Sequence, residues 1–186
     1  LSFTLVQFLL LIAAYYSINN KFSPSYSAYT LNEFTNIFKF ILLVGSLMIF
    51  HYTYKHLKFL KILKIEYFTI SLLGLIGTMI MISANSLLML YLGIELLSLS
   101  LYALIGFNKK SSLSSEAAIK YYVLGAMSSG ILLFGISLIY GFTGSIAYDD
   151  IASQLINIDM DSVDYIAIIF GIIFITASLC FKFGAA

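Results

Sequence analysis

Residues 86–107 read SLLMLYLGIELLSLSLYALIGF, and this stretch decides the fold class of the chain. Its one charged side chain is Glu95. An α-helix of about 20 mostly apolar residues is long enough to cross the roughly 30 Å of hydrocarbon in a bilayer. The run also lacks the regular apolar–polar alternation of a porin-type strand. We therefore predict that residues 86–107 form a transmembrane helix.

Five further apolar runs have a similar length and composition. They are Ser2–Ile18, Phe34–Phe50, Tyr67–Ala84, Ala117–Phe142 and Val163–Phe183. The first run lacks the basic leading residues and the small-residue cleavage site of a signal peptide, so we interpret it as a retained helix. The sequence thus predicts an all-α polytopic membrane protein with about six transmembrane helices.

The composition excludes several functional classes. The 186 residues are 61% hydrophobic and only 10% charged, with a mean hydropathy of +0.99, whereas soluble domains carry about 25% charged residues. This rules out an ordinary soluble enzyme, a disordered chain and a nucleic-acid binder. Cys180 is the single cysteine, so the sequence predicts no internal disulfide and no zinc-type metal site.

Lysines are distributed unevenly between the predicted loops. The connections after the second and fourth predicted helices contain Lys55, Lys58, Lys61, Lys64, Lys109 and Lys110. The loops of the opposite side contain Lys21 alone, so the positive-inside rule places the lysine-rich side in the cytoplasm or the mitochondrial matrix. The spacing of three across residues 55–64 fits either a short interfacial helix over anionic lipid or a solvated basic loop.

Four charged residues lie inside the predicted apolar segments: Lys39, Glu95, Lys120 and Lys182. A charge at the bilayer centre costs at least about 2.5–3.5 kcal/mol, so each must be paired, hydrated or near an interface. Glu95 is the deepest, since it lies about 14–18 Å from either end of its predicted helix. It is either a functional carboxylate or a protonated group that links neighbouring helices.

The three lysines allow a less specific interpretation, in which they extend along the helix to reach the interface. Lys182 lies about 28 Å from Val163 along the predicted helix, which favours this interpretation unless the helix begins outside the hydrocarbon. Lys39 is expected to be such an interfacial anchor. Lys120 lies near the lysine-rich side, where either role is open.

A membrane-embedded glutamate with a lysine partner can change its protonation state. Burial favours the neutral form of both groups, whereas their mutual attraction favours the charged forms. A movement between them, or a proton delivered nearby, therefore shifts the balance, and the two groups titrate as one unit. Small residues at 125–130 (GAMSSG) can line a hydrated path or can serve helix packing alone.

Three motifs in order resemble one known family. They are SANSLLMLYLGIELLSL at 83–99, SEAAIKYYVLGAMSSGILLFG at 115–135 and FKF at 181–183. Together they resemble the antiporter-like membrane-arm subunits of respiratory complex I, NADH-ubiquinone oxidoreductase chain 2 in particular. The resemblance implies a proton relay that pairs Glu95 with Lys182 across a half-channel, with Lys120 as a further member.

The resemblance also implies a domain organisation. Residues 1–66 would hold N-terminal helices and the basic loop, and residues 67–186 the first of two inverted antiporter-like repeats, ending at a broken helix. The family continues into a second repeat, so we expect either a fragment or a subunit made in two pieces, with a separate chain carrying the second repeat. Other complex I membrane-arm subunits and lipids are the remaining expected partners.

The function implied by the resemblance is proton translocation within NADH:ubiquinone oxidoreductase. No redox cofactor is expected on this chain, because it lacks cysteine ligand sets and a phosphate-binding glycine motif. A structural half-subunit without pumping and a cation/proton antiporter subunit are the alternatives. The expected location is the mitochondrial inner membrane, with a bacterial plasma membrane or a chloroplast membrane as the alternative.

Overall fold

The computed structural model describes residues 10, 12–13, 28–60, 64–157 and 163–184. Within these residues the elements are α2 (Glu33–Phe59), α3 (Ile65–Ile82), α4 (Leu87–Ile105), α5 (Ser112–Thr143), α6 (Tyr148–Asn157) and α7 (Val163–Lys182). All except α6 are long and apolar enough to cross a bilayer. The predicted all-α membrane fold is therefore confirmed.

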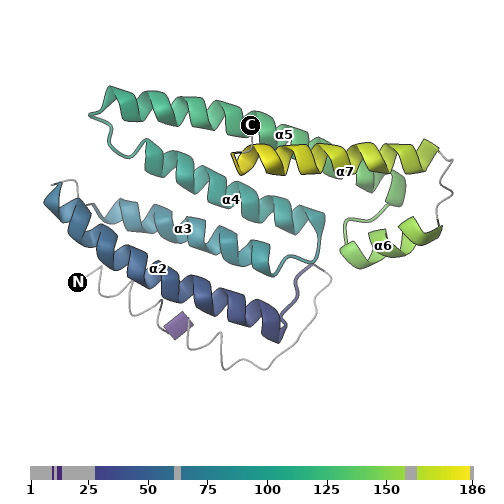
Figure 1. Cartoon of the computed structure of the whole chain (residues 1–186), viewed down its shortest axis with the longest axis horizontal. Coiled ribbons are helices and arrows are strands. Elements are labelled where there is room, and N and C mark those ends of the chain that lie inside the picture. The colour runs from purple at the N-terminus through teal and green to yellow at the C-terminus, as the bar shows by residue number, and fades with distance from the viewer. Residues whose placement is uncertain (1–9, 11, 14–27, 61–63, 158–162, 185–186) are drawn as a thin grey trace.

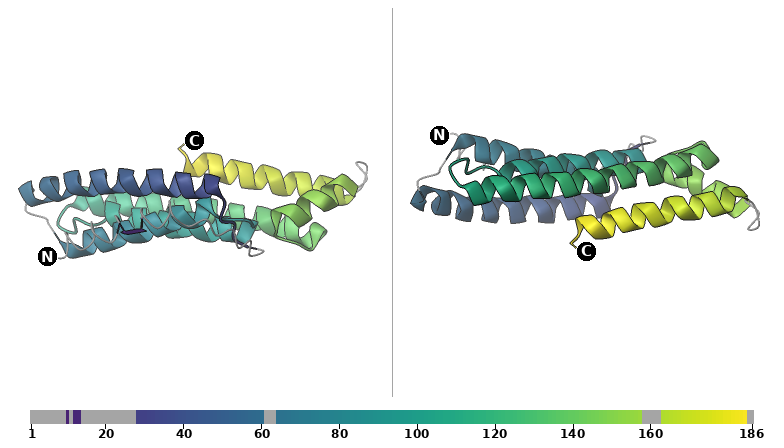
Figure 2. Two further views of the ribbon diagram at one scale, coloured as in Figure 1. Left: turned by 90° about the horizontal axis from the view of Figure 1, so that it is seen from below. Right: turned by 90° about the horizontal axis from the view of Figure 1, so that it is seen from above.

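The long helices lie side by side with their axes along one direction (Figure 1). In Figure 1 they follow the order α2, α3, α4 and α5, and α7 runs beside one half of α5. The two views of Figure 2 show α2 and α7 displaced to the same face of the layer formed by α3, α4 and α5. The most extensive contacts join α3 to α4 and α5 to α7, and the contact between α4 and α5 is smaller.

Glycines explain why these two pairs pack so closely. A Cβ atom added at Gly77 of α3 would lie 2.8 Å from the Gly93 carbonyl oxygen of α4. A Cβ atom added at Gly135 of α5 would lie 2.8 Å from the Gly171 carbonyl oxygen of α7. Membrane helices associate through such small residues because lipid supplies no hydrophobic driving force between helices. The bundle thus contains two tight antiparallel pairs, α3–α4 and α5–α7, that meet at α4 and α5, and α2 packs against α3.

Backbone hydrogen bonds join three connecting segments at one end of the bundle. Thr30 N–H donates to the Ser83 carbonyl, and Leu87 N–H donates to the Ile146 carbonyl. The segment at 83–87 lies between the other two and forms isolated β-bridges with both. Only residues 83–86 separate α3 from α4, so the turn between these two helices is short.

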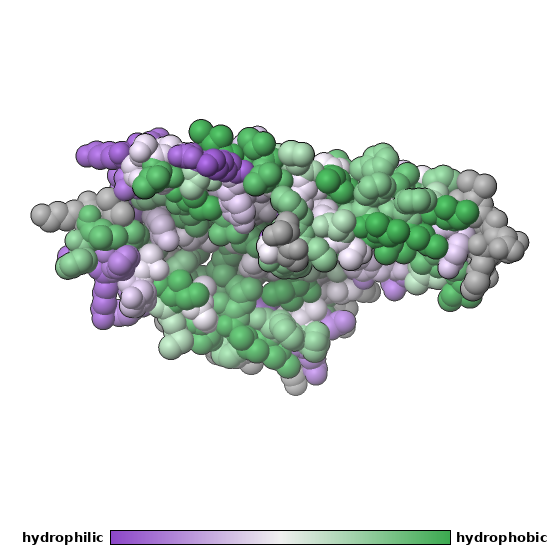
Figure 3. Space-filling view, turned by 45° about the horizontal axis from the view of Figure 1, so that its top comes forward, coloured by the Kyte–Doolittle hydropathy of each residue, from purple (hydrophilic) through white to green (hydrophobic). Residues whose placement is uncertain are grey.

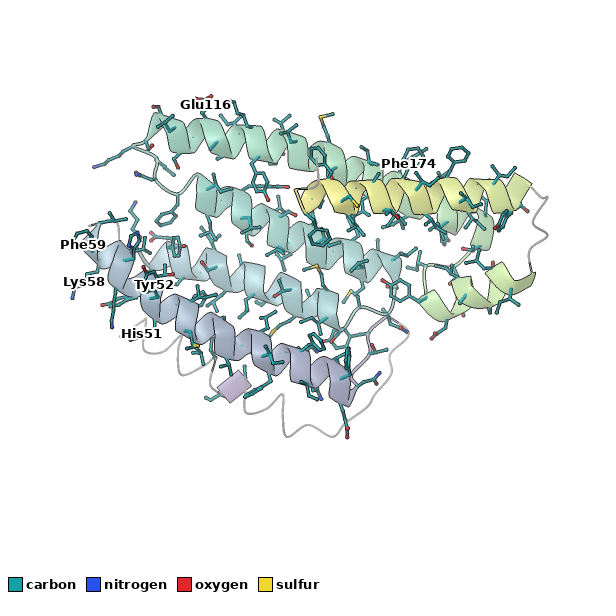
Figure 4. The ribbon with its side chains drawn as sticks, in the orientation of Figure 1. His51, Tyr52, Lys58, Phe59, Glu116 and Phe174 are labelled. Carbon is teal, nitrogen blue, oxygen red and sulfur yellow. The ribbon has the colours of Figure 1, made fainter. Side chains whose placement is uncertain are left out.

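Two predicted helix boundaries are wrong. Helix α2 does not end at Phe50 but continues to Phe59, so Lys55 and Lys58 lie in its last turns instead of in a separate interfacial helix or basic loop. Cationic side chains are favourable near a helix C-terminus, because the terminal carbonyls carry partial negative charge. Figure 4 shows Lys58 at this end of α2. Helix α5 begins at Ser112, not Ala117, because the Ser111 side chain caps it by accepting a hydrogen bond from Ser114 N–H.

Two segments outside the five long helices also bear on the sequence predictions. The predicted helix over Ser2–Ile18 lies outside the described residues apart from Leu10, Ile12 and Ala13. Helix α6 was not predicted from the sequence, because its ten residues include Asp149 and Asp150 in the first turn. It is amphipathic, and Ile151 packs into a hydrophobic cluster with residues of α4 and α5.

The outer surface of the bundle suits a lipid or protein environment. Many large apolar side chains are exposed along the helices, for example Met48 at 73% and Met127 at 63%. Water-soluble monomers rarely expose large contiguous apolar patches. In Figure 3, hydrophobic residues cover much of the visible face, and hydrophilic residues gather at one end. Glu116 and Lys58 both lie at that end of the bundle (Figure 4). This distribution fits a membrane-embedded body with a polar margin.

Candidate functional site

Glu95 and Lys182 form an ion pair inside the bundle. Glu95 lies in the middle of α4, and Lys182 is the last residue of α7. The distance from Lys182 Nζ to Glu95 Oε2 is 3.5 Å, and the side chains are 11% and 26% exposed, respectively. The sequence suggested each as a site residue, and the structure brings the two together.

The position of α7 explains how Lys182 reaches the bundle interior. Helix α7 runs antiparallel to the second half of α5, and its last turn lies about halfway along the bundle (Figure 1). The interpretation of Lys182 as an interfacial anchor, based on its distance from Val163, is therefore wrong. That count assumed that the helix ends at a membrane surface, whereas α7 ends beside the middle of α4.

Two serine hydroxyls complete the contacts of the ion pair. Ser129 of α5 donates a hydrogen bond of 2.6 Å to Glu95 Oε2. Lys182 Nζ donates to Ser129 Oγ at 2.8 Å and to Ser98 Oγ of α4 at 3.2 Å. Both hydroxyl contacts of Lys182 lie within the usual N–H···O range of about 2.7–3.2 Å, and the direct contact to the carboxylate lies beyond it.

A neighbouring pair of serines holds α7 against α5 at this level. Ser128 Oγ donates to the Ser178 carbonyl at 3.0 Å, and Ser178 Oγ donates to the Ser128 carbonyl at 2.7 Å. Both side chains are almost fully buried, at 2% and 1% exposure. These reciprocal bonds fix the register of the two helices, and with it the position of Lys182 relative to Ser129.

The third site residue suggested by the sequence lies elsewhere. Lys120 is in the third turn of α5, and it forms an ion pair with Glu116 on the same helix. Its side chain is 71% exposed. Ser129 follows nine positions later, which corresponds to about 13 Å along a helix. The structure therefore does not bring Lys120 into contact with the Glu95–Lys182 pair.

Lys39 differs from its expected role as an interfacial anchor. Its side chain is buried, with 7% exposure, and its Nζ atom donates to the Tyr29 hydroxyl at 2.9 Å. The same ammonium lies 4.9 Å from the centroid of the Tyr29 ring. Burial would raise the pKa of Tyr29, but the hydrogen bond from Lys39 and the positive charge of Lys39 outweigh it, so the pKa lies below its ordinary value. The anchor prediction was wrong because it considered α2 alone, without the preceding segment that covers Lys39.

The bridging position of Ser129 and the partnership of Lys39 with Tyr29 were not found from the sequence. Ser129 was noted only as one small residue in the GAMSSG stretch. The adjacent Ser128 was a partial sign of this role, because two consecutive residues of a helix point in directions about 100° apart. One therefore faces α7, and the other faces α4. Nothing in the sequence indicated which tyrosine would meet Lys39.

Chemically, this arrangement places proton donors and acceptors from three helices in contact. An ammonium, a hydroxyl and a carboxylate are joined by short hydrogen bonds between three helices. The pair can exist as two opposite charges or, after one proton moves, as two neutral groups.

Comparison with known proteins identifies the relatives of this site. The family model described as "NADH:quinone oxidoreductase/Mrp antiporter, TM" matches residues 84–186, which is more than half of the chain. The chain belongs to this family. The match includes Glu95, Ser129 and Lys182, and hence α4, α5 and α7, which form the site. It supports the resemblance found in the sequence at the level of the antiporter family.

Relatives within the antiporter family include two bacterial proteins named NADH-quinone oxidoreductase subunit N. The protein from Ruthia magnifica subsp. Calyptogena magnifica is 42% identical over 158 residues, covering 85% of this chain and 33% of that protein. The protein from Thiobacillus denitrificans (strain ATCC 25259 / T1) is 45% identical over 152 residues, covering 81% of this chain and 31% of that protein. The chain thus spans about a third of the length of these relatives.

Two solved structures share the fold. A chain of the archaeal membrane-bound sulfane sulfur reductase superimposes with a TM-score of 0.77 and 22% identity, covering 96% of this chain and 38% of that one. A chain of respiratory complex I from Thermus thermophilus gives a TM-score of 0.65 and 23% identity, covering 91% of this chain and 37% of that one. At this level of identity the likeness shows the fold alone.

Proposed function

We propose that this chain is a proton-translocating membrane-arm component of an NADH:quinone oxidoreductase, and that Glu95 and Lys182 hold and release the proton. The observation that carries this proposal is the ion pair of 3.5 Å inside a bundle of apolar helices. Charged groups at such a depth are costly, and in membrane proteins they commonly mark proton or ion pathways. The subunit N relatives supply the assembly in which the pathway would work.

The pair would work by alternating between two states. In the charged state, the ammonium and the carboxylate stabilise each other. When α4 and α7 move apart, each charge loses its partner, and the surrounding hydrocarbon then favours the neutral forms. The lysine would pass its proton to the glutamate, which would release it toward one side, and the lysine would take up the next proton from the other. Redox chemistry would belong to other subunits of the assembly.

In this proposal, Lys120 exchanges protons at the exposed end of α5 and lies apart from the Glu95–Lys182 pair. It is exposed near the first turns of α5, at the lysine-rich end of the bundle. There it would exchange protons with water or with a neighbouring subunit, about 13 Å from Ser129. Its substitution should therefore slow translocation less than substitution of Lys182.

The assembly and its location are also part of the proposal. Other membrane-arm subunits would cover the exposed apolar faces, and a second antiporter-like repeat, on the same or a separate polypeptide, would pack against this unit. The membrane would be a bacterial plasma membrane or a mitochondrial inner membrane, with the lysine-rich end in the cytoplasm or matrix. The bacterial origin of the relatives favours the first of these.

The test measures proton uptake per NADH oxidised in vesicles that contain the assembled complex. Glu95→Gln and Lys182→Met should each lower this ratio, and Lys120→Met should lower it less. Glu66→Gln and Lys58→Met are matched controls, because both residues are exposed at helix ends. An unchanged ratio in both pair variants, in fully assembled complex, would mean that the chain is a scaffold without pumping. Sodium-dependent proton exchange without NADH would instead indicate a cation/proton antiporter.

A further inference from the structure

The shortest polar path between Lys182 and Glu95 passes through the Ser129 hydroxyl. The two hydrogen bonds of this path measure 2.8 Å and 2.6 Å. The direct distance between Nζ and Oε2 is 3.5 Å, longer than an ordinary N–H···O hydrogen bond. Direct proton transfer would therefore require the two groups to approach, whereas the hydroxyl already connects them.

The hydroxyl is also oriented for transfer. A serine hydroxyl has one hydrogen to donate and two lone pairs that can accept. The lysine ammonium can only donate, and the ionised carboxylate can only accept. The Ser129 hydrogen must therefore point to Glu95, while a lone pair receives a hydrogen from Lys182. Both bonds run in the same direction, from the ammonium to the carboxylate.

Ser98, the other hydroxyl that contacts Lys182, cannot perform this role in the observed geometry. Its hydroxyl hydrogen is donated to the Ile94 carbonyl at 2.8 Å. It therefore accepts from Lys182 and passes its own hydrogen to a backbone group, which does not take up a proton. Of the two hydroxyls in contact with Lys182, only Ser129 leads to the carboxylate.

We propose that the Ser129 hydroxyl transfers the proton between Lys182 and Glu95. The inference rests on the proposed function and names the group that completes its relay. In one step, an N–H bond of Lys182 breaks as that proton binds Ser129 Oγ, and the original Oγ–H bond breaks as its proton binds Glu95 Oε2. One proton is thus moved, the serine hydroxyl is restored, and the charged pair becomes a neutral amine and a neutral carboxylic acid. The reverse step regenerates the ion pair.

The test compares two buried serines of neighbouring helices in the assembled complex. Ser129→Ala removes the bridging hydroxyl and changes the side-chain volume little. Ser100→Ala is the matched control, since Ser100 of α4 is as buried as Ser129, at 5% exposure, and donates to the Leu96 carbonyl of its own helix. The readouts are proton uptake per NADH and the solvent deuterium isotope effect on NADH-driven proton uptake. Positioned proton-transfer groups contribute about 10²–10⁴-fold to rates, so we expect Ser129→Ala to slow proton uptake by about tenfold or more.

The expected pattern has three parts. Ser129→Ala lowers proton uptake to the level of Glu95→Gln and alters the isotope effect, Ser100→Ala leaves the isotope effect unchanged, and Ser129→Thr restores most of the lost activity. Normal uptake in Ser129→Ala, with loss in Glu95→Gln and Lys182→Met, would overturn the bridge but keep the proposed function. An equal loss in Ser100→Ala, or a well-assembled Ser129→Thr protein without activity, would also overturn it. Normal uptake in the Glu95 and Lys182 variants would instead remove the proposed function.

Discussion

The contact between Gly135 and Gly171 offers a sharp test of how packing supports the site. In Gly135→Ala, the new Cβ atom would lie 2.8 Å from the Gly171 carbonyl oxygen and 3.0 Å from the Ile175 backbone nitrogen. Ordinary van der Waals contact begins near 3.4 Å, so α5 and α7 must separate by about 0.6 Å. Backbone atoms cannot rotate away as a side chain can, and such overpacking costs about 1–3 kcal/mol.

This separation should also reach the ion pair. Ser129 lies six residues from Gly135, or about 9 Å along α5. Its hydrogen bond from Lys182 spans the same two helices and measures 2.8 Å. Lengthened by about 0.6 Å, it would leave the normal hydrogen-bond range of about 2.7–3.2 Å. We therefore expect Gly135→Ala to lower both thermal stability and proton uptake per NADH, although no polar group has been changed.

The control for this prediction is Gly141→Ala. Gly141 is on the same helix, and an added Cβ atom there meets nothing within 4 Å. Both variants are assembled into the complex and compared by thermal unfolding in detergent and by proton uptake in vesicles. The reasoning is refuted if Gly135→Ala is as stable and as active as Gly141→Ala.

Two further predictions concern the end of the bundle where the connecting segments meet. Tyr29→Phe removes the hydroxyl that accepts a hydrogen bond from buried Lys39, so we expect a loss of about 1.5–3 kcal/mol in the free energy of unfolding. The control is Tyr52→Phe, at an exposed tyrosine of α2, which should change the free energy of unfolding little. Gly144 ends α5 with φ of +67° and has open space around its Cα, so Gly144→Ala should cost about 1–2 kcal/mol through backbone strain alone. Equal thermal stabilities of either variant and the wild-type protein would contradict the corresponding prediction.

Apolar length was enough to predict the spanning helices α2, α3, α4, α5 and α7. The segment of α4 around Glu95 could be assigned as a helix, because a continuous apolar segment in lipid must satisfy its backbone hydrogen bonds within itself. Helix ends were less predictable: the sequence placed Lys55 and Lys58 in a short interfacial helix or a basic loop, although the end of a long helix tolerates and even favours them. Helix α6 was missed because its short amphipathic pattern resembles a polar connection.

The candidate site could be predicted only in part, for a geometric reason. Glu95 and Lys182 were suggested by the cost of charge in a bilayer, which is a property of each residue and its own helix. The bridging by Ser129 depends on how closely α4, α5 and α7 pack. The sequence of any one of these helices does not determine that packing. Lys39 shows the same limit, because its burial arises from the segment containing Tyr29.

The division of the bundle into two glycine-packed pairs has a mechanical consequence for the relay. Ser129 and Lys182 belong to α5–α7, whereas Glu95 and Ser98 belong to α3–α4. Helix shifts in proteins are typically about 1–2 Å. A slide of that size at the smaller α4–α5 contact would separate Lys182 and Ser129 together from the Glu95 carboxylate. The hydrogen bond between Lys182 and Ser129 would remain, because both residues belong to the α5–α7 pair. Protonation of the pair and sliding of the helices would then be coupled, so a force that displaces either helix pair would change the proton affinity of Glu95 and Lys182.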